Sequence, residues 1–367
     1  MKKILILTWT PFFKSDYKKY DLHTLEKKNK IFIFDISRIV YKNFNIDNIY
    51  KKNDRIKVHN YFKVKELIKD LKNINIDLVI NATGLEKKNP IIDVILKKDV
   101  KIISIYDYKN FESFFFSKKI VFYIKYIIKT FQIFFCPKNL NEIAFMCSKN
   151  IDNQVVSLGK KIFYSHSFAY DYFLREKKKL LSKKKTVAYI DSGFGFHPDF
   201  FVTRGINKKF KINSYSKKIN NLFKNFKDLG YEINFLSHPK VDIKNQKIYK
   251  NCKIVNNNTY KYIKSSEIVI VTSSSVIDLA IIHKKKILRV FANEMNSYPE
   301  NIKDFKAASK FFNNKFLNLD QSLDIKRDIF NDIMMPGKLY QKYFDSYIKH
   351  PHSNDIKFSK LIDSFLN

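Results

Sequence analysis

Short, continuous apolar runs alternate with Lys-rich stretches along the chain. The first four runs are ILIL at 4–7, IFIFDIS at 31–37, IDLVINATG at 76–84 and VKIISIYD at 100–107. Runs of this kind, rich in Ile and Val and ending in Asp, Thr, Asn or Gly, are typical of strands buried on both faces of a parallel sheet. The segments between them have the length of crossover connections. The pattern predicts a βαβ, Rossmann-like domain over roughly the first 110 residues.

The stretch 111–135 interrupts this alternation. It is long and apolar, and it contains Lys118, Lys119, Lys125 and Lys129. Four lysines argue against a transmembrane helix, which needs about 20 largely uncharged residues. Three of the lysines and Gln132 fall on one face of a helix. Two interpretations stay open: an amphipathic helix on an anionic membrane surface, and a large core helix with one solvated stripe.

The alternating pattern restarts after the charged segment 174–185. Strand-like runs include TVAYIDSG at 186–193, YEINFLSHP at 231–239, VIVTSSS at 269–275 and KILRVF at 286–291. Helical spacing over 219–230 stops at Gly230, a residue favoured at helix ends. We therefore expect an α/β chain with two Rossmann-like domains, 1–175 and 186–345, and a helical tail over 346–367. Their parallel sheets should carry helices on both faces.

The net charge of +34, from 69 Lys and Arg against 35 Asp and Glu, changes the range of expected partners. Such a charge favours nucleic acid, anionic lipid or nucleotide phosphates. The excess is almost entirely Lys, and abundant Lys, Asn, Ile, Phe and Tyr are also typical of an AT-rich genome. Proteins that recognise a duplex sequence rely on Arg for bidentate base contacts, and Arg is rare here. Nucleic acid is therefore not an expected partner.

Cysteine content and the N-terminus bear on the compartment. Cys136, Cys147 and Cys252 are too few and too scattered for a disulfide framework or a zinc site, which fits a reducing cytoplasm. The apolar core of the first residues is shorter than the 7 to 15 or so residues of a signal peptide. No D-x-D motif and no His/Cys spacing for a metal stands out, so no metal is expected.

Polar groups follow the strands of the second predicted domain. They are Asp191-Ser192-Gly193, Ser237-His238-Pro239 and the run Thr272, Ser273, Ser274 and Ser275. Ligands of open parallel sheets bind beyond the carboxyl ends of the strands. A helix beginning at about Ser275 or Val276 would present free N–H groups and a positive dipole end, so the hydroxyl run predicts a phosphate site. Plain N-capping is the alternative.

His238 and Asp191 are the candidate chemical groups. Pro239 stiffens the turn behind His238, whose imidazole could donate to a phosphate oxygen or protonate a leaving group; a structural histidine is the alternative. Gly193 and Gly195, in a chain with only 7 Gly, mark a sharp bend or a close approach. Asp191 could be a general base or orient a ligand, with His197 and Asp199 as polar neighbours. An Asx-turn is the alternative.

Together, two Rossmann-like domains, an Asp-x-Gly turn, a His-Pro after a strand and a Ser run before a helix resemble bacterial GT-B glycosyltransferases. The resemblance is to the sialyltransferase and Kdo- or nonulosonate-transferase type, which builds surface glycans from CMP-activated acidic sugars. It implies Asp191 as the base, His238 as phosphate ligand or acid, and Ser273 and Ser274 as phosphate ligands. It places the remaining strand-end residues beside the nucleotide: Ser192, Gly193, Ser237, Pro239, Thr272 and Ser275.

The sequence departs from this family at the base. Ser192 stands where the family motif prefers a second acid, and the motif follows the first strand of the second domain. The base could therefore come from the first domain. Candidates there are Asp107, Asp16, His166 and Asp171.

The resemblance implies a glycosyltransferase that moves an acidic sugar from a CMP donor to a glycan or glycolipid acceptor. The acceptor would be lipooligosaccharide, O-antigen or capsule, bound by 1–175, and the donor would be bound by 186–345. GT-B enzymes of this kind commonly need no metal or other cofactor. The enzyme would be cytoplasmic, at the inner face of the membrane.

Other functions stay open. On the same scaffold they are a UDP-sugar transferase, a nucleotide-sugar 2-epimerase and a polyol-phosphate transferase. A non-catalytic anion- or membrane-binding protein is the alternative of a different class. A Rossmann dehydrogenase is disfavoured because no G-x-G-x-x-G follows a strand.

Overall fold

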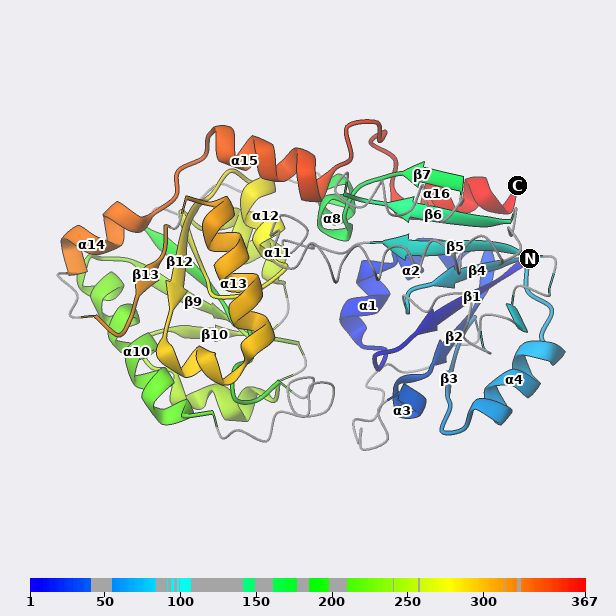
Figure 1. Cartoon of the computed structure of the whole chain (residues 1–367), viewed down its shortest axis with the longest axis horizontal. Coiled ribbons are helices and arrows are strands. Elements are labelled where there is room, and N and C mark those ends of the chain that lie inside the picture. The colour runs from blue at the N-terminus through cyan, green and yellow to red at the C-terminus, as the bar shows by residue number, and fades with distance from the viewer. Residues whose placement is uncertain are drawn as a thin grey trace, which may run out of the picture. The chain divides into compact units, whose positions relative to one another are not determined.

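The chain forms two compact units, each built on one parallel sheet (Figure 1). The computed structural model describes residues 1–40, 55–83, 91, 94–95, 98, 100–106, 141–148, 161–176, 185–197, 210–239, 241–256, 258–313, 315–321 and 325–367. The first unit takes its described residues from 1–106, 141–175 and 345–367, and the second from 176–344. Each unit is described by itself.

The sheet of the first unit has seven parallel strands in the order β3-β2-β1-β4-β5-β6-β7. The strands are β1 (Lys2–Thr8), β2 (Asn29–Asp35), β3 (Ile56–Asn60), β4 (Leu78–Asn81), β5 (Lys101–Tyr106), β6 (Glu142–Met146) and β7 (Lys161–Tyr164). Ile4 of β1 is in register with Ile31 and Leu78. The strand order reverses between β1 and β4, as in a Rossmann sheet.

Helices cover both faces of this sheet, which explains the continuous apolar runs. They are α1 (Lys14–Lys19), α2 (Leu22–Leu25), α3 (Ser37–Val40), α4 (Val64–Asn73), α8 (Phe168–Arg175) and α16 (Phe358–Leu366). Leu5 of β1 packs in one cluster with Leu67 of α4, while Ile4 packs in another with Phe358 of α16. Because successive side chains point to opposite faces, the buried stretch 4–7 of β1 is apolar at every position.

The second unit repeats this topology with six parallel strands in the order β10-β9-β8-β11-β12-β13. The strands are β8 (Thr186–Ile190), β9 (Glu232–Leu236), β10 (Lys253–Val255), β11 (Ile268–Val271), β12 (Lys286–Phe291) and β13 (Leu317–Asn318). The helices are α10 (Ile212–Asp228), η3 (Ile243–Ile248), α11 (Thr259–Ser265), α12 (Ile277–Ile282), η4 (Asn293–Ser297), α13 (Pro299–Phe311), α14 (Ile325–Asp332) and α15 (Lys338–Tyr343). A π-helical turn, η5 (Phe344–Ile348), follows α15.

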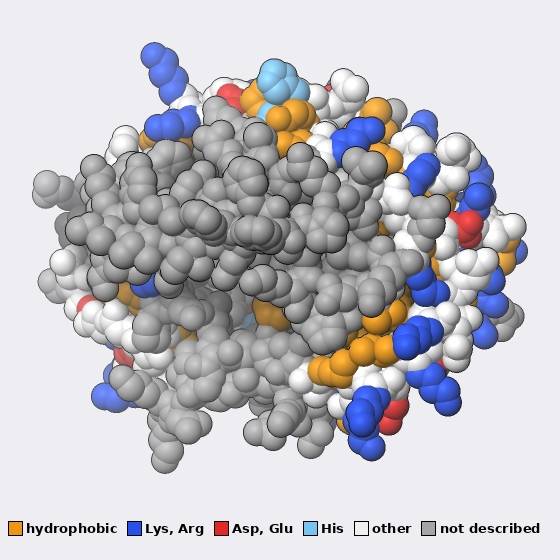
Figure 2. Space-filling view, turned by 45° about the vertical axis from the view of Figure 1, so that its right-hand side comes forward, with side chains coloured by type: hydrophobic (Ala, Val, Ile, Leu, Met, Phe, Trp, Pro, Cys, Tyr) orange, Lys and Arg blue, Asp and Glu red, His pale blue; other side chains and the backbone are white. Residues whose placement is uncertain are grey.

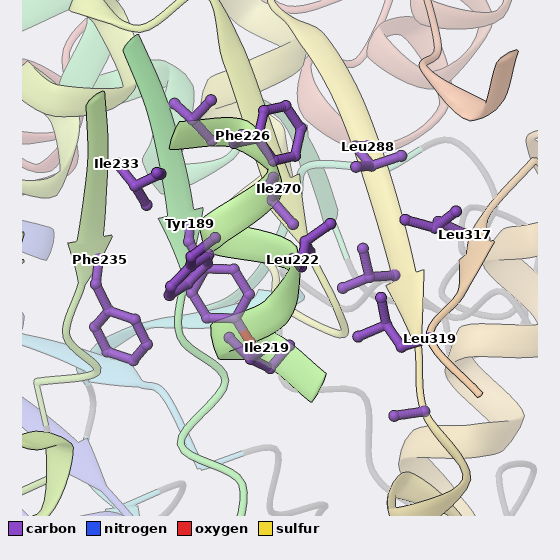
Figure 3. Packing of buried hydrophobic residues seen from close by; sticks show 14 of the residues in the cluster. Tyr189, Ile219, Leu222, Phe226, Ile233, Phe235, Ile270, Leu288, Leu317 and Leu319 are labelled. Carbon is purple, nitrogen blue, oxygen red and sulfur yellow. The ribbon is translucent and has the colours of Figure 1, made fainter. Parts of the chain in front are cut away.

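The core of the second unit lies between α10 and the sheet (Figure 3). Leu222 and Phe226 of α10 share a cluster with Tyr189, Ile233 and Ile270 from three adjacent strands. Helical spacing puts the apolar residues of α10 on one stripe, which packs on the sheet. The core therefore fixes the strands whose carboxyl ends carry the candidate site.

The predicted α/β class with two parallel sheets is confirmed, and several strands were missed by the sequence pattern. These are β3, β6, β7 and the two-residue β13. β3 and β7 lie at the edges of their sheet, where one side is open and polar residues such as Lys57 and His59 interrupt the apolar run. The predicted helix end at Gly230 is confirmed: α10 ends at Asp228, and Gly230 has a φ of 81°.

Residues 346–367, predicted as a helical tail, belong together with Asp345 to the first unit. Their helix α16 packs on α2 and adds Phe358, Leu361 and Ile362 to the core beneath β1. A chain end that returns to the first sheet makes its stability depend on residues far away in the sequence.

Segment 111–135 lies outside the described residues, so the amphipathic helix stays a prediction. Among the helices that the structure describes, none combines the length and apolarity required to cross a bilayer. On the face shown in Figure 2, Lys and Arg side chains are spread over the described surface, with Asp and Glu among them. Within the described part of this face, the positive charge is thus distributed rather than gathered in one patch.

Replacing Phe358 with Ala should lower the free energy of unfolding of the first unit by about 3–5 kcal/mol, the usual cost of removing a buried Phe. The ring is 2% exposed and meets Phe145 and Phe168 edge to face. Urea denaturation followed by the fluorescence of Trp9, the single tryptophan, reports on this unit. Phe62→Ala is the control: that ring is 60% exposed, and the change should stay within about 1 kcal/mol. Equal losses would contradict the role of α16.

Candidate functional site

The predicted site residues of the second unit meet at one edge of its sheet. β9, β8 and β11 are adjacent and parallel, so their carboxyl ends share that edge. The strand order reverses between β8 and β11, and ligands of doubly wound sheets bind at such a switch point. Asp191 follows β8, His238 follows β9 and Thr272 follows β11. The structure therefore brings together three groups that are far apart in the sequence.

The hydroxyl run divides into inward and outward members. Thr272 is buried, and its Oγ1 lies 2.6 Å from the Oγ of Ser192. The Ser192 hydroxyl also donates to the Ser273 carbonyl oxygen over 2.9 Å. Ser274 accepts a hydrogen bond from the N–H of Val276, and Ser275 is exposed. Two hydroxyls thus join β8 to β11, and the last residues of the run face outward before α12 begins at Ile277.

The carboxylate of Asp191 joins three segments. Its Oδ1 accepts a hydrogen bond from Gly193 N over 2.8 Å, the two-residue spacing of an Asx-turn. Its Oδ2 accepts from Gln246 Nε2 over 2.8 Å and from His238 N over 3.4 Å. The side chain is buried, and burial raises the pKa of the carboxyl to about 6, although these hydrogen bonds oppose the shift. The geometry favours a positioning role over that of a general base.

The turn after Asp191 contains the sharp bend that its two glycines led us to expect. Gly193 and Gly195 have φ values of 70° and 83°, a region that favours glycine. A Cβ at Gly193 would lie 3.0 Å from the Cβ of His197. The carbonyl of Gly193 accepts hydrogen bonds from Phe196 N and His197 N. Gly193 is therefore needed both for the bend and for the room that His197 takes up.

His238 lies against a second histidine. Its ring centroid is 4.2 Å from that of His197, with 57° between the ring planes. His197 is 8% exposed, whereas His238 is half-buried and followed by the exposed Pro239. Ser237 is buried, and its N–H donates to Val255 O of the next strand. The sequence pattern marked His197 only as a neighbour of Asp191.

Gln246 is the site residue that sequence reasoning missed. It lies on η3, is fully buried, and donates to Asp191 through Nε2. Its Oε1 is buried and has no hydrogen-bond partner among the described residues. A single Gln in the polar stretch 242–250 carries no sequence signal that could have identified it.

His166 and Asp171, two of the described candidates for a base in the first unit, hold the C-terminal segment. His166 Nε2 lies 2.8 Å from Ile356 O. Asp171 accepts a hydrogen bond from Phe358 N over 2.5 Å and forms an ion pair with Arg175 Nε at 2.9 Å. Burial raises the pKa of the Asp171 carboxyl, and the charge of Arg175 opposes this. These contacts favour a structural role for both residues.

The structure says less about the other predicted positions. Asp16 accepts a hydrogen bond from Phe13 N at the start of α1. Asp107 and Asp199 lie outside the described residues. Within the described part of the chain, no cluster of three His, Cys, Asp or Glu side chains could hold a metal ion. Whether the protein requires a cofactor stays a prediction.

Comparison with known proteins supports the fold. No family model matches the chain, and no curated protein sequence does either. A Listeria monocytogenes protein described as a UDP-N-acetylglucosamine 2-epimerase has a similar structure, with a TM-score of 0.52 and 12% identity over 98% of this chain and 94% of that one. For UDP-GlcNAc 2-epimerase of Methanocaldococcus jannaschii the TM-score is 0.49, with 15% identity over 99% of each chain. For Acinetobacter baumannii MurG it is 0.45, with 10% identity over 100% and 99%.

At these identities the likeness concerns the fold alone. Two parallel sheets, each with the strand order of a Rossmann domain, and the likeness to the Listeria structure place the chain in the GT-B class of folds.

Asp191 should make stability fall as the pH rises. A carboxyl whose pKa rises from about 3.9 to about 6 on folding binds a proton more tightly in the native state, so the free energy of unfolding falls between these pH values. The loss should be about 3 kcal/mol. Asp191→Asn removes this dependence, and the Gln246 amide can turn so that its Oε1 accepts from the new amide. Circular dichroism during urea unfolding, from pH 4 to 7.5, measures the difference.

The matched control is Asp228→Asn, which changes an exposed carboxyl at the end of α10. Its stability should follow the pH as that of the wild type does. A pH dependence of Asp191→Asn equal to that of the wild type would contradict the raised pKa.

Proposed function

We propose that this protein is an enzyme that acts on a nucleotide-activated sugar, whose phosphate binds at the carboxyl edge of the second sheet. One observation carries the proposal: the Asp191 turn, His238 and the hydroxyl run from Thr272 converge where the strand order reverses between β8 and β11. In a doubly wound sheet this is the place for a nucleotide. The GT-B class of fold supports the same conclusion, because such folds host many enzymes of nucleotide sugars.

Glycosyl transfer is the reaction that these side chains suit best. Transfer breaks the bond between sugar and phosphate and forms a bond between the sugar and an acceptor hydroxyl, whose proton passes to a base or to water. The negative charge that this leaves on the phosphate oxygens needs hydrogen-bond donors or a proton. His238 is half-buried at the strand end and can supply a proton or a hydrogen bond. Ser273 and Ser274 are partly exposed after β11, two strands away in the sheet, and can donate to the same oxygens. The net charge of +34 favours the approach of an anionic donor.

Epimerisation of a nucleotide sugar is the second candidate, favoured by the fold likeness to a protein described as a UDP-N-acetylglucosamine 2-epimerase. An epimerase needs acid and base groups that reach the sugar ring. Among the described candidates, the carboxylates of Asp191 and Asp171 are buried and engaged in hydrogen bonds. Transfer requires fewer free acid and base groups near the sugar ring than epimerisation does, and it is therefore the preferred reaction.

The donor is a uridine or cytidine nucleotide sugar in this proposal. The sequence motifs resemble those of transferases that use CMP-activated acidic sugars, and the fold likeness is to a protein named for a UDP-sugar. The acceptor would be a surface glycan or glycolipid on the side of the first unit. Contact with an anionic membrane through 111–135 belongs to the same proposal.

Nucleotide selectivity tests the proposal. UMP, UDP, CMP, CDP and GDP are each added in a thermal-shift assay at moderate salt. We expect one pyrimidine nucleotide to stabilise the protein by about 2–3 kcal/mol at roughly a hundredfold excess over its Kd. His238→Ala should remove most of this stabilisation, because it removes the donor at the strand end. His352→Ala, which changes an exposed histidine of the first unit, should retain it.

The outcome separates the functions. Equal shifts with every nucleotide would overturn the enzyme proposal and favour a non-catalytic anion-binding protein, and no shift with any of them would overturn the enzyme proposal as well. If UDP binds, NMR spectra of UDP-GlcNAc incubated with the protein distinguish the reactions. Formation of the 2-epimer would contradict glycosyl transfer and assign epimerisation to the protein.

A further inference from the structure

Two histidines come together at the carboxyl edge of the second sheet, and only one of them has a proposed role. His197 and His238 come from different loops, and their ring centroids are 4.2 Å apart. His197 is 8% exposed, so its ring faces the protein, while His238 is half-buried beside the exposed Pro239. The buried ring is therefore placed to support the more exposed one.

The loops that carry the two rings are tied to each other. Asp191 accepts a hydrogen bond from Gly193 N in one loop and from His238 N in the other. Gln246 holds the carboxylate from η3. In the first loop, the N–H of His197 donates to Gly193 O over 2.7 Å. The backbones on both sides of the ring contact are thus fixed through one buried carboxylate.

Fixing the backbone of His238 does not fix its ring. A histidine side chain still rotates about two bonds, and its ring torsion is broad. Pro239 restricts the backbone that follows His238, not the rotation of the His238 ring. The His197 ring, whose plane lies at 57° to that of His238, packs against the His238 ring and restricts its rotation. Gly193 leaves room for this packing, since a Cβ there would lie 3.0 Å from His197 Cβ.

We propose that His197 is a positioning residue, whose buried ring holds the His238 imidazole in the orientation that meets the donor phosphate. The proposal rests on the proposed function and adds a second residue to it. His197 acts through His238 and does not itself contact the ligand. Asp191, held by Gln246, acts less directly, because its hydrogen bonds position the backbones of the two loops.

A double-mutant cycle tests this assignment. The affinities for UDP, CMP and inorganic pyrophosphate are measured by isothermal titration calorimetry for wild type, His197→Ala, His238→Ala and the double variant. Loss of a hydrogen bond to a charged group should make His238→Ala bind about 10- to 100-fold more weakly. His197→Ala should bind at least about 5-fold more weakly. In the double variant, loss of His197 should add nothing, because a residue that acts through His238 has no effect once His238 is gone.

A conservative variant separates ring packing from the imidazole nitrogens. His197→Phe keeps an aromatic ring against His238 and should bind within about 2-fold of wild type. Binding by His197→Ala equal to that of wild type would overturn the proposal. So would additive losses in the double variant, or a loss in His197→Phe equal to that in His197→Ala, since both indicate direct contact of His197 with the ligand.

The same titrations distinguish the inference from the function on which it rests. If wild type binds one nucleotide and His197→Ala binds it equally well, the proposed function stands and the positioning role falls. If wild type binds none of the three probes, both fall. Urea midpoints of the ligand-free variants show whether each retains the fold, and His352→Ala serves as the matched histidine control in the other unit.

Discussion

The buried carboxylate of Asp191 is the contact on which the candidate site depends. It accepts hydrogen bonds from the turn after β8, from the loop after β9 and from η3 at the same time. A carboxylate in an apolar surrounding is stable only if N–H donors satisfy it, and here three donors do so. Removing it would leave those donors buried without an acceptor, which usually costs more than the hydrogen bonds themselves contribute. The loops of His197 and His238 therefore stay together only while this acceptor is present.

The first unit uses a buried aspartate in the same way. Asp171 accepts the N–H of Phe358, which lies 187 positions further along the chain, and pairs with Arg175. In both units, then, a buried carboxylate joins segments that are remote in the sequence, after β8 in the second unit and on α8 in the first. A charged group in such a position resembles a catalytic base when only the sequence is known. Whether it acts on a substrate or holds the fold is decided by what fills its lone pairs, and that depends on tertiary structure.

This difference sets the limit of what the sequence could predict. Strands buried on both faces carry continuous apolar runs, so β1, β2 and β8 could be found, whereas the edge strands β3 and β7 could not. The grouping of Asp191, His238 and Thr272 was also predictable, because carboxyl ends of parallel strands share an edge. Gln246 was not, since its partner is 55 positions away and its own segment has no periodicity. The packing of His197 on His238 could not be predicted either, because it depends on the three-dimensional course of the turn.

The glycine at 193 shows why this small site is sensitive to shape as well as to charge. Its N–H satisfies Asp191, its carbonyl closes the turn onto His197, and its missing side chain leaves space for that ring. Any Cβ at this position would meet His197 Cβ at 3.0 Å and Val241 Cγ2 at 3.1 Å, in a backbone conformation that other residues rarely adopt. The loop would have to move away from β9, and the carboxylate would then lose one of its two loops. The hydrogen bonding of Asp191 and the close packing of the two imidazoles therefore both depend on Gly193, because it has no side chain.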